Sequence, residues 1–308
     1  MSNPLHIIIL AAGEGTRMKS NRPKMLQTVG GRPMLTHLLD TAASLTREKI
    51  HVVVGSGSER VMEACAGYPV DWVHQAERRG TGHAVMQAMP GVPDDADVLV
   101  LLGDTPLIPG ELLADMVDQF HGPLSLLTME LEDPTGYGRI LRDPGGNIIG
   151  VIEHKDAEPH QHAIREVNTG IIMAQAGKLR GWLDRIGCDN AKQEYYLPDI
   201  FSLARAENGE IPGVVAPDAA DLQGANDRRQ LAELERRYQG RQAEKLMASG
   251  VQLIDPQRID VRAEVDAGMN VLIDVNVVLE GRVRPVSYTH LTLPTIILPC
   301  RSRWAPDH

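Results

Sequence analysis

The sequence predicts an α/β protein built on a doubly wound, Rossmann-like parallel sheet. Three short apolar runs rich in β-branched residues, at 5–10, 50–54 and 98–102, are typical of buried parallel strands. Stretches with helical spacing separate these runs, so strands and helices alternate as they do in βαβ units. A glycine-rich turn directly follows the first run, where open α/β sheets bind their ligands.

Size and composition set limits on function. A chain of 308 residues has room for about two domains of roughly 150 residues. With 43% hydrophobic, 23% charged and only 4% aromatic residues, the composition indicates a globular protein with an aliphatic core. A net charge of -10 disfavours a nucleic-acid partner. Three cysteines without paired spacing, no signal peptide and no apolar stretch of about 18 residues predict a cytoplasmic protein without a membrane span.

The pattern changes beyond the third apolar run. Segments 124–131, 148–153 and 168–173 are strand-like with little helix between them. They predict a mixed-sheet insertion, a natural place for a second ligand to dock beside the first. Helical spacing returns at 178–186 and 197–206.

The last third of the chain follows two further patterns. Residues 227–249 are rich in strong helix formers and predict one long helix. Val265, Val271, Val277 and Val283 then recur every six residues, which indicates coils of a hexapeptide β-helix. Prolines and polar residues break this row afterwards, so we predict a non-native tail produced by a frameshift, assembly or cloning event. The predicted divisions are a catalytic domain over 1–226, a linker helix over 227–250, a truncated β-helix over 251–283 and the tail over 284–308.

The segment LAAGEGTRM at 10–18 carries the first chemical motif. Small residues and glycines after a buried strand let backbone N–H groups face a phosphate, and Arg17 and Lys24 add cations nearby. The third glycine of a dinucleotide fingerprint is missing, because that position is Met18, and no Gly-Lys-Ser/Thr closes a Walker A loop. A tight turn with solvated surface cations is the alternative.

The segment QAERRGTGHA supplies groups suited to a nucleobase. The Gln75 amide offers a donor and an acceptor to a base edge, and Gly80 and Thr81 permit close approach before a helix begins. Alternatively, Thr81 is simply the cap of that helix and His83 a histidine on its surface.

Gly103 and Asp104 end the third apolar run, where a carboxylate is placed to hold a hard cation such as Mg²⁺. Asn226 is the expected partner, although it could instead cap the helix that follows, and Asp104 could serve only a turn. In the insertion, Gly138, Glu153 and Asn168 offer a backbone N–H, a carboxylate and an amide for sugar hydroxyls. Taken singly, these three are ordinary loop residues.

In this order, the motifs resemble the bacterial family of bifunctional N-acetylglucosamine-1-phosphate uridyltransferase/glucosamine-1-phosphate acetyltransferases. The resemblance covers about residues 5–283. LAAGEGTRM followed by RPKML marks sugar nucleotidyltransferases broadly, whereas GTGHA, DPTGYGRI and IEHKDA point to this member. The other matching segments are LGDTPL, VNTGI, QEYYLPDI and GAND.

The resemblance implies an Mg²⁺-dependent transfer of UMP from UTP to N-acetylglucosamine 1-phosphate, which gives UDP-N-acetylglucosamine and pyrophosphate. It implies Arg17 and Lys24 as catalytic cations, and Asp104 and Asn226 as ligands of Mg²⁺. The chain departs from the family at Leu102, where members often carry tyrosine. The residues implied to bind substrates are Leu10, Ala11, Ala12, Gly13, Lys24, Gln75, Gly80, Thr81, Leu102, Gly103, Asp104, Gly138, Glu153, Asn168 and Asn226.

The family's second activity is acetyl transfer in a long left-handed β-helix that also builds a trimer. Here the β-helix pattern begins near Val251 and ends at Val283 after roughly two or three coils, a marginal length for a repeat architecture. We therefore expect no acetyltransferase activity and no stable homotrimer. Two alternatives to uridylyl transfer onto N-acetylglucosamine 1-phosphate remain open: a nucleotidyltransferase for another sugar phosphate or base, such as a glucose-1-phosphate uridylyl- or thymidylyltransferase, and a non-catalytic nucleotide-sugar sensor.

Overall fold

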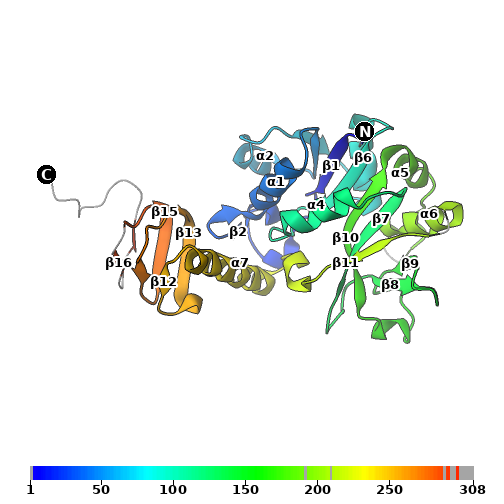
Figure 1. Cartoon of the computed structure of the whole chain (residues 1–308). Coiled ribbons are helices and arrows are strands. Elements are labelled where there is room, and N and C mark those ends of the chain that lie inside the picture. Colours follow the sequence, from blue (N-terminus) through cyan, green and yellow to red (C-terminus); the bar gives the residue numbers. More distant parts are fainter. Residues whose placement is uncertain (1–2, 191–192, 209, 287–288, 292–295, 298–308) are drawn as a thin grey trace. The chain divides into compact units, whose positions relative to one another are not determined.

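The computed structural model describes residues 3–190, 193–208, 210–286, 289–291 and 296–297. It divides into two compact units (Figure 1). The first comprises Met1–Leu26 and Met34–Gly224, and the second comprises Gln27–Pro33 and Ala225–His308.

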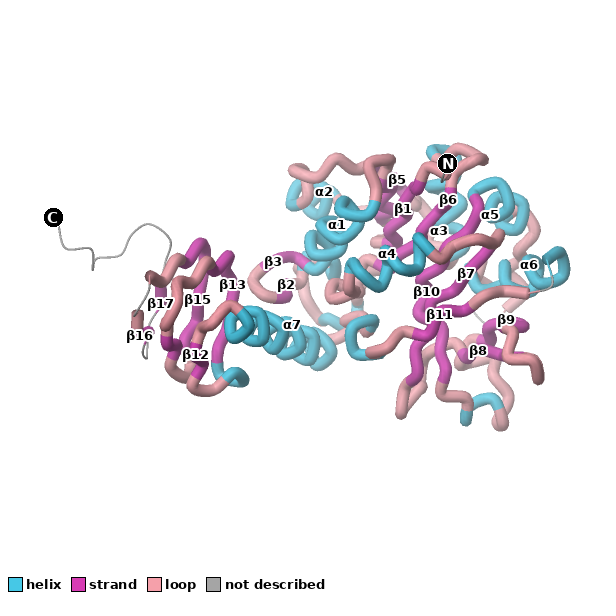
Figure 2. The backbone as a smooth tube through the Cα atoms, in the orientation of Figure 1, coloured by secondary structure: helices cyan, strands magenta, loops and turns pink. Residues whose placement is uncertain are grey.

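The first unit is built on a mixed sheet of nine strands (Figure 2). β1 (Leu5–Leu10) pairs in parallel with β4 (Ile50–Val54) and β6 (Asp97–Leu102), whereas β10 (Glu166–Gln175) is antiparallel to both β6 and β7 (Leu124–Glu130). The predicted α/β fold with a mixed sheet is confirmed. In spatial order the main path is β11 (Gly213–Val215), β7 (Leu124–Glu130), β10 (Glu166–Gln175), β6 (Asp97–Leu102), β1 (Leu5–Leu10), β4 (Ile50–Val54) and β5 (Asp71–His74), and β8 (Arg139–Arg142) and β9 (Ile148–Ile152) branch from β10.

Helices cover both faces of this sheet, because alternate side chains of each buried strand point to opposite sides. Ile7 and Ile9 of β1 belong to one core cluster, and Ile8 and Leu10 belong to the other. The first face is covered by α1 (Met34–Leu45), α2 (Glu59–Ala64) and α4 (Gly110–Asp118), and the second by α3 (Thr81–Ala88), α5 (Ala176–Leu183) and α6 (Ile200–Asn208). Short 3-10 helices lie at Thr16–Met18, Lys24–Leu26, Met89–Gly91, Gln161–Ala163, Leu197–Asp199, Ala219–Leu222 and Pro256–Arg258.

Two histidines stack near the beginning of β1 and β4. The ring centroids of His6 and His51 are 5.4 Å apart, and His6 Nδ1 lies 3.1 Å from His51 Nε2. Both side chains are buried. Burial lowers the pKa of each histidine, and at His51 the neighbouring imidazole lowers the pKa further while Asp71 raises it. The stacked pair is therefore most compatible with neutral rings.

We expect the unfolding free energy to decrease as the pH is lowered from about 7.5 to about 5. Over this range the histidines bind protons more readily in the unfolded chain than in the native protein, where their pKa is lowered. The stabilisation is fully present above the ordinary histidine pKa of 6.5 and is lost as the pH falls below it. Each histidine contributes at most about 1.4 kcal/mol per pH unit. Urea unfolding at both pH values measures the effect. His51→Gln should weaken the pH dependence and the exposed-site control His121→Gln should not; equal slopes in all three proteins would contradict the assignment.

The second unit joins a short hairpin to a long helix. The hairpin strands are β2 (Thr28–Val29) and β3 (Arg32–Pro33), and the helix is α7 (Arg228–Ala248). The N–H of Gly30 donates to the Glu235 carboxylate at 2.7 Å, and Gly30, at φ +57, lies against the Tyr238 ring. The predicted domain boundaries do not anticipate that residues 27–33 belong with this unit, because the contact joins residues about two hundred positions apart.

Short parallel strands complete the second unit. Ile259 pairs with Val277 and Val265 with Val283, so partners are eighteen positions apart, which is three repeats of six. Their side chains form a separate apolar core with α7. The strands are β12 (Gln252–Leu253), β13 (Ile259–Val265), β14 (Leu272–Ile273), β15 (Val277–Val283), β16 (His290–Leu291) and β17 (Ile296–Ile297).

Strand pairing continues beyond the point where the valine row ends. His290–Leu291 pairs with Leu272–Ile273, and β17 pairs with β15 in the same parallel sense. The structure thus extends the pairing past Val283, since backbone hydrogen bonds do not require valine at each row position. Most of the predicted tail lies outside the described residues, so its non-native origin and the expected absence of acetyl transfer stay predictions.

Candidate active site

The sheet gathers the chemical motifs at one edge. β1 and β6 run in parallel with Leu10 opposite Leu102, so the turns that follow both strands emerge side by side. β10 runs the other way against β6, with Ile172 opposite Val100, so the beginning of β10 arrives at the same edge. Open α/β sheets bind ligands at this edge, beyond the carboxyl ends of their parallel strands.

A bulge in β10 fixes the orientation of Asn168. The pairing of β10 with β7 shifts register between Asn168 and Ile172, where Gly170 adopts φ +78. The N–H of Gly170 donates to Asn168 Oδ1 at 2.8 Å, and the Thr169 hydroxyl donates to the Leu127 carbonyl at 2.6 Å. These bonds stabilise the bulge, in which the backbone between Asn168 and Ile172 departs from regular pairing with β7. The amide nitrogen of the Asn168 side chain can still donate to a ligand.

The strands β8 and β9 bring two more predicted residues to Asn168. Arg139 lies opposite both Val167 of β10 and Ile152 of β9. Gly138 and Glu153 therefore flank the same point, and the Asn168 N–H donates to the Gly138 carbonyl at 2.9 Å. A Cβ added to Gly138 would lie 3.4 Å from Glu153 Oε1, so the Glu153 carboxylate lies beside Gly138.

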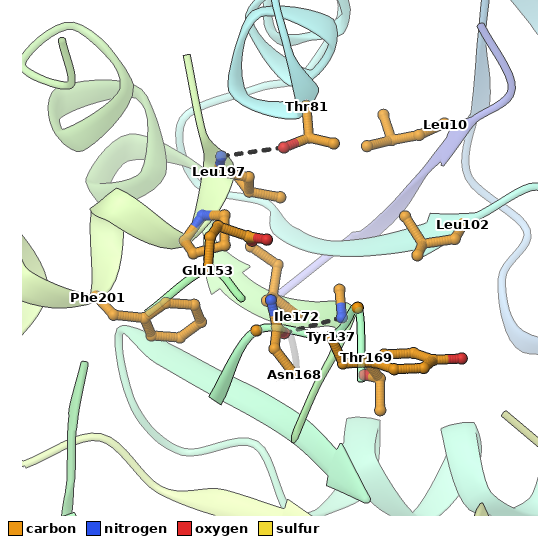
Figure 3. A pocket seen from close by; sticks show the side chains of 14 residues that line it. Leu10, Thr81, Leu102, Tyr137, Glu153, Asn168, Thr169, Ile172, Leu197 and Phe201 are labelled. Atoms are coloured by element: carbon orange, nitrogen blue, oxygen red, sulfur yellow. Dashed lines mark hydrogen bonds between the residues drawn. The ribbon is translucent and has the colours of Figure 1, made fainter. Parts of the chain in front are cut away.

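These residues line a cavity that we call the insertion cavity (Figure 3). Glu153 and Asn168 supply a carboxylate and an amide, while leucines, Ile172 and Phe201 supply an apolar wall. The structure thus brings together six of the predicted substrate residues, at positions 10, 81, 102, 138, 153 and 168. The full lining is Leu10, Thr81, Leu102, Gly136, Tyr137, Gly138, Glu153, Asn168, Thr169, Gly170, Ile172, Leu197, Pro198 and Phe201.

A second hollow, the loop cavity, lies over the glycine-rich turn. Gly15 adopts φ +67, and a Cβ there would come within 2.5 Å of Lys24 Cβ, so glycine is needed for Lys24 to pass beneath the turn. The lining is Ala11, Ala12, Gly13, Glu14, Ser20, Asn21, Arg22, Pro23, Lys24, Met25, Gly55, Ser56, Gly57, Ser58, Val61 and Arg78. A turn of this kind, with cations beside it, is suited to binding phosphate groups.

A third hollow, the central cavity, shares lining residues with both others. Leu10, Thr81 and Leu102 also line the insertion cavity, whereas Ala12, Gly13, Lys24, Met25 and Arg78 also line the loop cavity. Its own residues are Gln75, Gly80, Ala84, Asp104 and Glu194. The three cavities are therefore adjacent, and a ligand with several parts can span them.

Lys24 and Asp104 meet where the loop and central cavities join. The Lys24 ammonium forms a short ion pair with the Asp104 carboxylate, and only 8% and 17% of the two side chains are exposed. An ion pair this deeply placed holds both groups in fixed positions. Asp104 lies in the turn that follows β6 and does not cap α4, which begins six residues later with Pro109 at its N-cap.

The QAERRGTGHA segment is tied to a distant part of the chain. Gln75 Nε2 donates to the Gly80 carbonyl at 3.2 Å and lies 3.1 Å from His83 Nδ1. Thr81 does not cap α3, because Gly80 occupies that position; instead the Thr81 hydroxyl accepts from the Leu197 N–H at 3.1 Å (Figure 3). Accepting that bond leaves the Thr81 hydroxyl hydrogen able to donate to a ligand.

Three predicted residues fall outside these cavity linings. Arg17 is exposed on its 3-10 helix, and Gly103 is buried with its N–H donating to the Leu10 carbonyl at 2.9 Å. Asn226 belongs to the second unit, where its N–H donates to the Gln230 side chain. The cap of α7 is Asp227, whose carboxylate accepts from two backbone N–H groups, so Asn226 is not needed for that purpose. The roles predicted for these three residues stay predictions.

Sequence reasoning missed several lining residues. Tyr137 and Phe201 form part of the insertion cavity, and burial together with the Asp104 charge raises the pKa of the Tyr137 hydroxyl, so this group stays protonated near neutral pH. The sequence offered a signal for these two residues. The chain contains only 2 Phe and 6 Tyr, and aromatic residues commonly line ligand pockets, so each was a candidate for a pocket. Arg78 lines both other cavities, and the sequence motifs assign it no role.

The donor set at the sheet edge fits a cation shared with a ligand. Gly224 packs on Asp104, since an added Cβ would lie 3.1 Å from Asp104 Cγ. No group of three or more His, Cys, Asp or Glu side chains able to hold a metal occurs within the described ranges. Mg²⁺ commonly takes one or two protein carboxylates, retains waters and is completed by substrate phosphates. Asp104 fits that pattern and does not fit a metal held by protein side chains alone.

Comparisons with known proteins agree with this geometry. A family model described as the MobA-like NTP transferase domain matches residues 7–135. The bifunctional protein GlmU of Alkalilimnicola ehrlichii is 52% identical over 283 residues, which cover 92% of this chain and 61% of the relative. GlmU of Stenotrophomonas maltophilia is 50% identical over 284 residues, which cover 92% and 62%. A solved UDP-glucose pyrophosphorylase complexed with UDP-glucose superposes with a TM-score of 0.62 at 16% identity, covering 76% of this chain and 98% of that one.

The fold and the matching domain model define a nucleotidyltransferase domain with a Rossmann-like mixed sheet. The chain spans about 61% of the length of the first of these relatives. At about 50% identity over nearly its whole length, it belongs to the GlmU family. The family predicted from the sequence motifs is confirmed. Within the described residues, no helix is both long and apolar enough to cross a membrane.

Proposed function

We propose that the protein transfers UMP from UTP to N-acetylglucosamine 1-phosphate, which yields UDP-N-acetylglucosamine and pyrophosphate. The observation that carries this proposal is the row of three adjacent cavities, with the Lys24–Asp104 pair where two of them join. Membership of the GlmU family supports the choice of a nucleotidyltransferase over other uses of the fold.

Each cavity suits one part of the substrates. The loop cavity receives the triphosphate, with Leu10, Ala11, Ala12 and Gly13 supplying the turn and Lys24 a positive charge. The central cavity receives the uracil against Gln75, Gly80 and Thr81. The insertion cavity receives the sugar, with Gly138, Glu153 and Asn168 binding hydroxyl and amide groups while its apolar wall accommodates the acetyl methyl.

The reaction requires no covalent enzyme intermediate. A phosphate oxygen of the sugar phosphate attacks the α-phosphorus of UTP, a new P–O bond forms, and the bond from the α-phosphorus to the bridging oxygen breaks to release pyrophosphate. The chain's own contribution is to hold two anions in line and to place the Lys24 ammonium near the charge that develops on the leaving group. Bound Mg²⁺, held by Asp104 and Asn226, would neutralise phosphate charge. Arg17 is proposed as a further cation.

The glycine-rich turn gives a matched pair of variants. A Cβ on Gly13 meets no atom within 4 Å, and its φ is not positive, so we expect Gly13→Ala to fold normally and to raise KM for UTP by roughly three- to tenfold through contact with bound phosphate. Gly15→Ala meets Lys24 at φ +67 and should lower Tm by several degrees. Thermal melts and steady-state kinetics separate the two effects. Unchanged KM in Gly13→Ala would place the triphosphate elsewhere.

A substrate panel tests the proposed function. Pyrophosphate release is measured with N-acetylglucosamine, glucosamine and glucose 1-phosphates against UTP and dTTP, with Mg²⁺ or with EDTA. We expect release to be fastest with N-acetylglucosamine 1-phosphate and UTP, and to stop with EDTA. Preference for glucose 1-phosphate or for dTTP would favour the alternative sugar nucleotidyltransferases. Binding of UDP-N-acetylglucosamine without turnover of any pair would favour a sensor.

A further inference from the structure

Arg78, in the QAERRGTGHA segment, binds the glycine-rich turn that follows β1. Its Nε donates to the Ala12 carbonyl at 2.9 Å, and its Nη1 forms a short ion pair with the Glu14 carboxylate. Gly55, at the end of β4, makes room for it, since an added Cβ there would lie 3.0 Å from Arg78 Nη2. The guanidinium therefore lies against the turn that the proposed function assigns to phosphate.

The two bonds of Arg78 differ in how easily they can be replaced. The bond to the Ala12 carbonyl holds one edge of the planar guanidinium against the backbone. The Glu14 contact uses the other edge and is open to solvent, with 38% of the Arg78 side chain and 56% of the Glu14 side chain exposed. Exposed ion pairs contribute little to stability, so exchanging Glu14 for another anion costs little.

A triphosphate is a stronger partner than a carboxylate for this edge. Phosphate oxygens accept two parallel bonds from the guanidinium fork, and a polyphosphate carries several negative charges. Lys24, a buried cation of the loop cavity, is already paired with Asp104. Arg78 lines both the loop and the central cavity, so it faces the path from nucleobase to phosphates.

We propose that Arg78 is a phosphate-binding residue whose guanidinium exchanges the Glu14 carboxylate for a phosphate of the bound nucleotide. In the free protein, the Glu14 carboxylate occupies the position of that phosphate and keeps the guanidinium oriented. It therefore competes with the nucleotide for Arg78. This inference rests on the proposed use of a nucleoside triphosphate. It predicts that neutralising Arg78 weakens phosphate binding, whereas neutralising Glu14 strengthens it.

The neighbouring arginine provides a matched control. The Arg79 guanidinium lies over the Tyr195 ring at 5.1 Å from its centroid, and Arg79 lines neither the loop nor the central cavity. Arg78→Gln and Arg79→Gln therefore remove the same charge one residue apart. A general electrostatic attraction would weaken equally in both, whereas direct phosphate binding would weaken only in Arg78→Gln.

The test is calorimetric titration of the full chain with inorganic pyrophosphate in Mg²⁺, together with KM for UTP. We expect Arg78→Gln to raise Kd for pyrophosphate by about five- to tenfold, Arg78→Lys to fall between it and the parent, and Arg79→Gln to stay within about twofold. Glu14→Gln should lower Kd by about threefold, and this gain should vanish in the Arg78→Gln background.

Three results would overturn the proposal: parental affinity in Arg78→Gln, equal loss in Arg79→Gln, or weaker binding in Glu14→Gln. If Arg78→Gln melts at a much lower temperature, Glu14→Gln still decides the question, because exchange requires tighter binding when the carboxylate is gone. The titration reads pyrophosphate binding without turnover. Failure of the proposed function would instead appear as no release of pyrophosphate from UTP by the parent protein.

Discussion

Asp104→Asn is expected to lower kcat of the proposed uridylyl transfer by about a thousandfold or more, because it removes the central-cavity carboxylate proposed to share a cation with the phosphates. The protein should stay folded. The asparagine oxygen still accepts from Lys24, so the loss of unfolding free energy is at most about that of one charge-assisted hydrogen bond, roughly 1.5–3 kcal/mol. That is smaller than the roughly 5–15 kcal/mol of a typical folded protein.

Steady-state kinetics and a urea melt of the same preparation check this expectation. The melt separates a lost reaction from a lost fold, and the Mg²⁺ dependence of the residual rate shows whether the carboxylate acts through the metal. Asp156→Asn, in the exposed part of the IEHKDA segment, is the control for removing one negative charge. Near-normal turnover in Asp104→Asn would contradict the assignment of Asp104.

Lys24→Met is expected to lower kcat by about 100- to 1,000-fold and to raise KM for UTP, because the ammonium is a buried cation in the lining of the cavity proposed to receive the phosphates. Methionine keeps the apolar stem that packs beneath Gly15, so the turn should retain its shape. Kinetics with UTP as the varied substrate separate the two effects.

The control for Lys24→Met is Lys178→Met, which removes an exposed lysine of α5 that pairs with Glu207. Its turnover should equal that of the parent. The double variant Lys24→Met/Asp104→Asn should lose little more activity than Asp104→Asn alone, since groups that act as a unit are strongly non-additive. Fully multiplicative losses would mean that Lys24 and Asp104 act independently, against the pairing described here.

The central strands could be predicted because their own residues form continuous apolar runs, which indicate burial. β1 and β4 carry continuous runs of β-branched residues, which only a strand covered on both faces requires. The short strands β8 and β11 carry no such signal, since RILR and GVV are too brief to show a period. Segment 197–206 reads as one helix but divides at Pro198 into a 3-10 turn and α6.

Site residues could be predicted where one short segment of sequence contains all the groups that point to a function. The glycine-rich turn with Lys24 and the carboxylate after β6 are recognisable because each follows directly from a strand end. The environment of Thr81 could not be predicted, because its partner is the Leu197 backbone. The Glu14–Arg78 pair also joins two separate motifs, and no spacing rule links positions 64 residues apart.

The most direct test of the central claim follows the α-phosphorus itself. UTP labelled with ³²P at the α position is incubated with N-acetylglucosamine 1-phosphate, Mg²⁺ and the full chain, and the products are separated by chromatography. We predict that all label leaving UTP appears in UDP-N-acetylglucosamine, with unlabelled pyrophosphate released in equal amount, and that Asp104→Asn or EDTA prevents this. Label that remains in UTP, or that appears in UMP without nucleotide sugar, would contradict it.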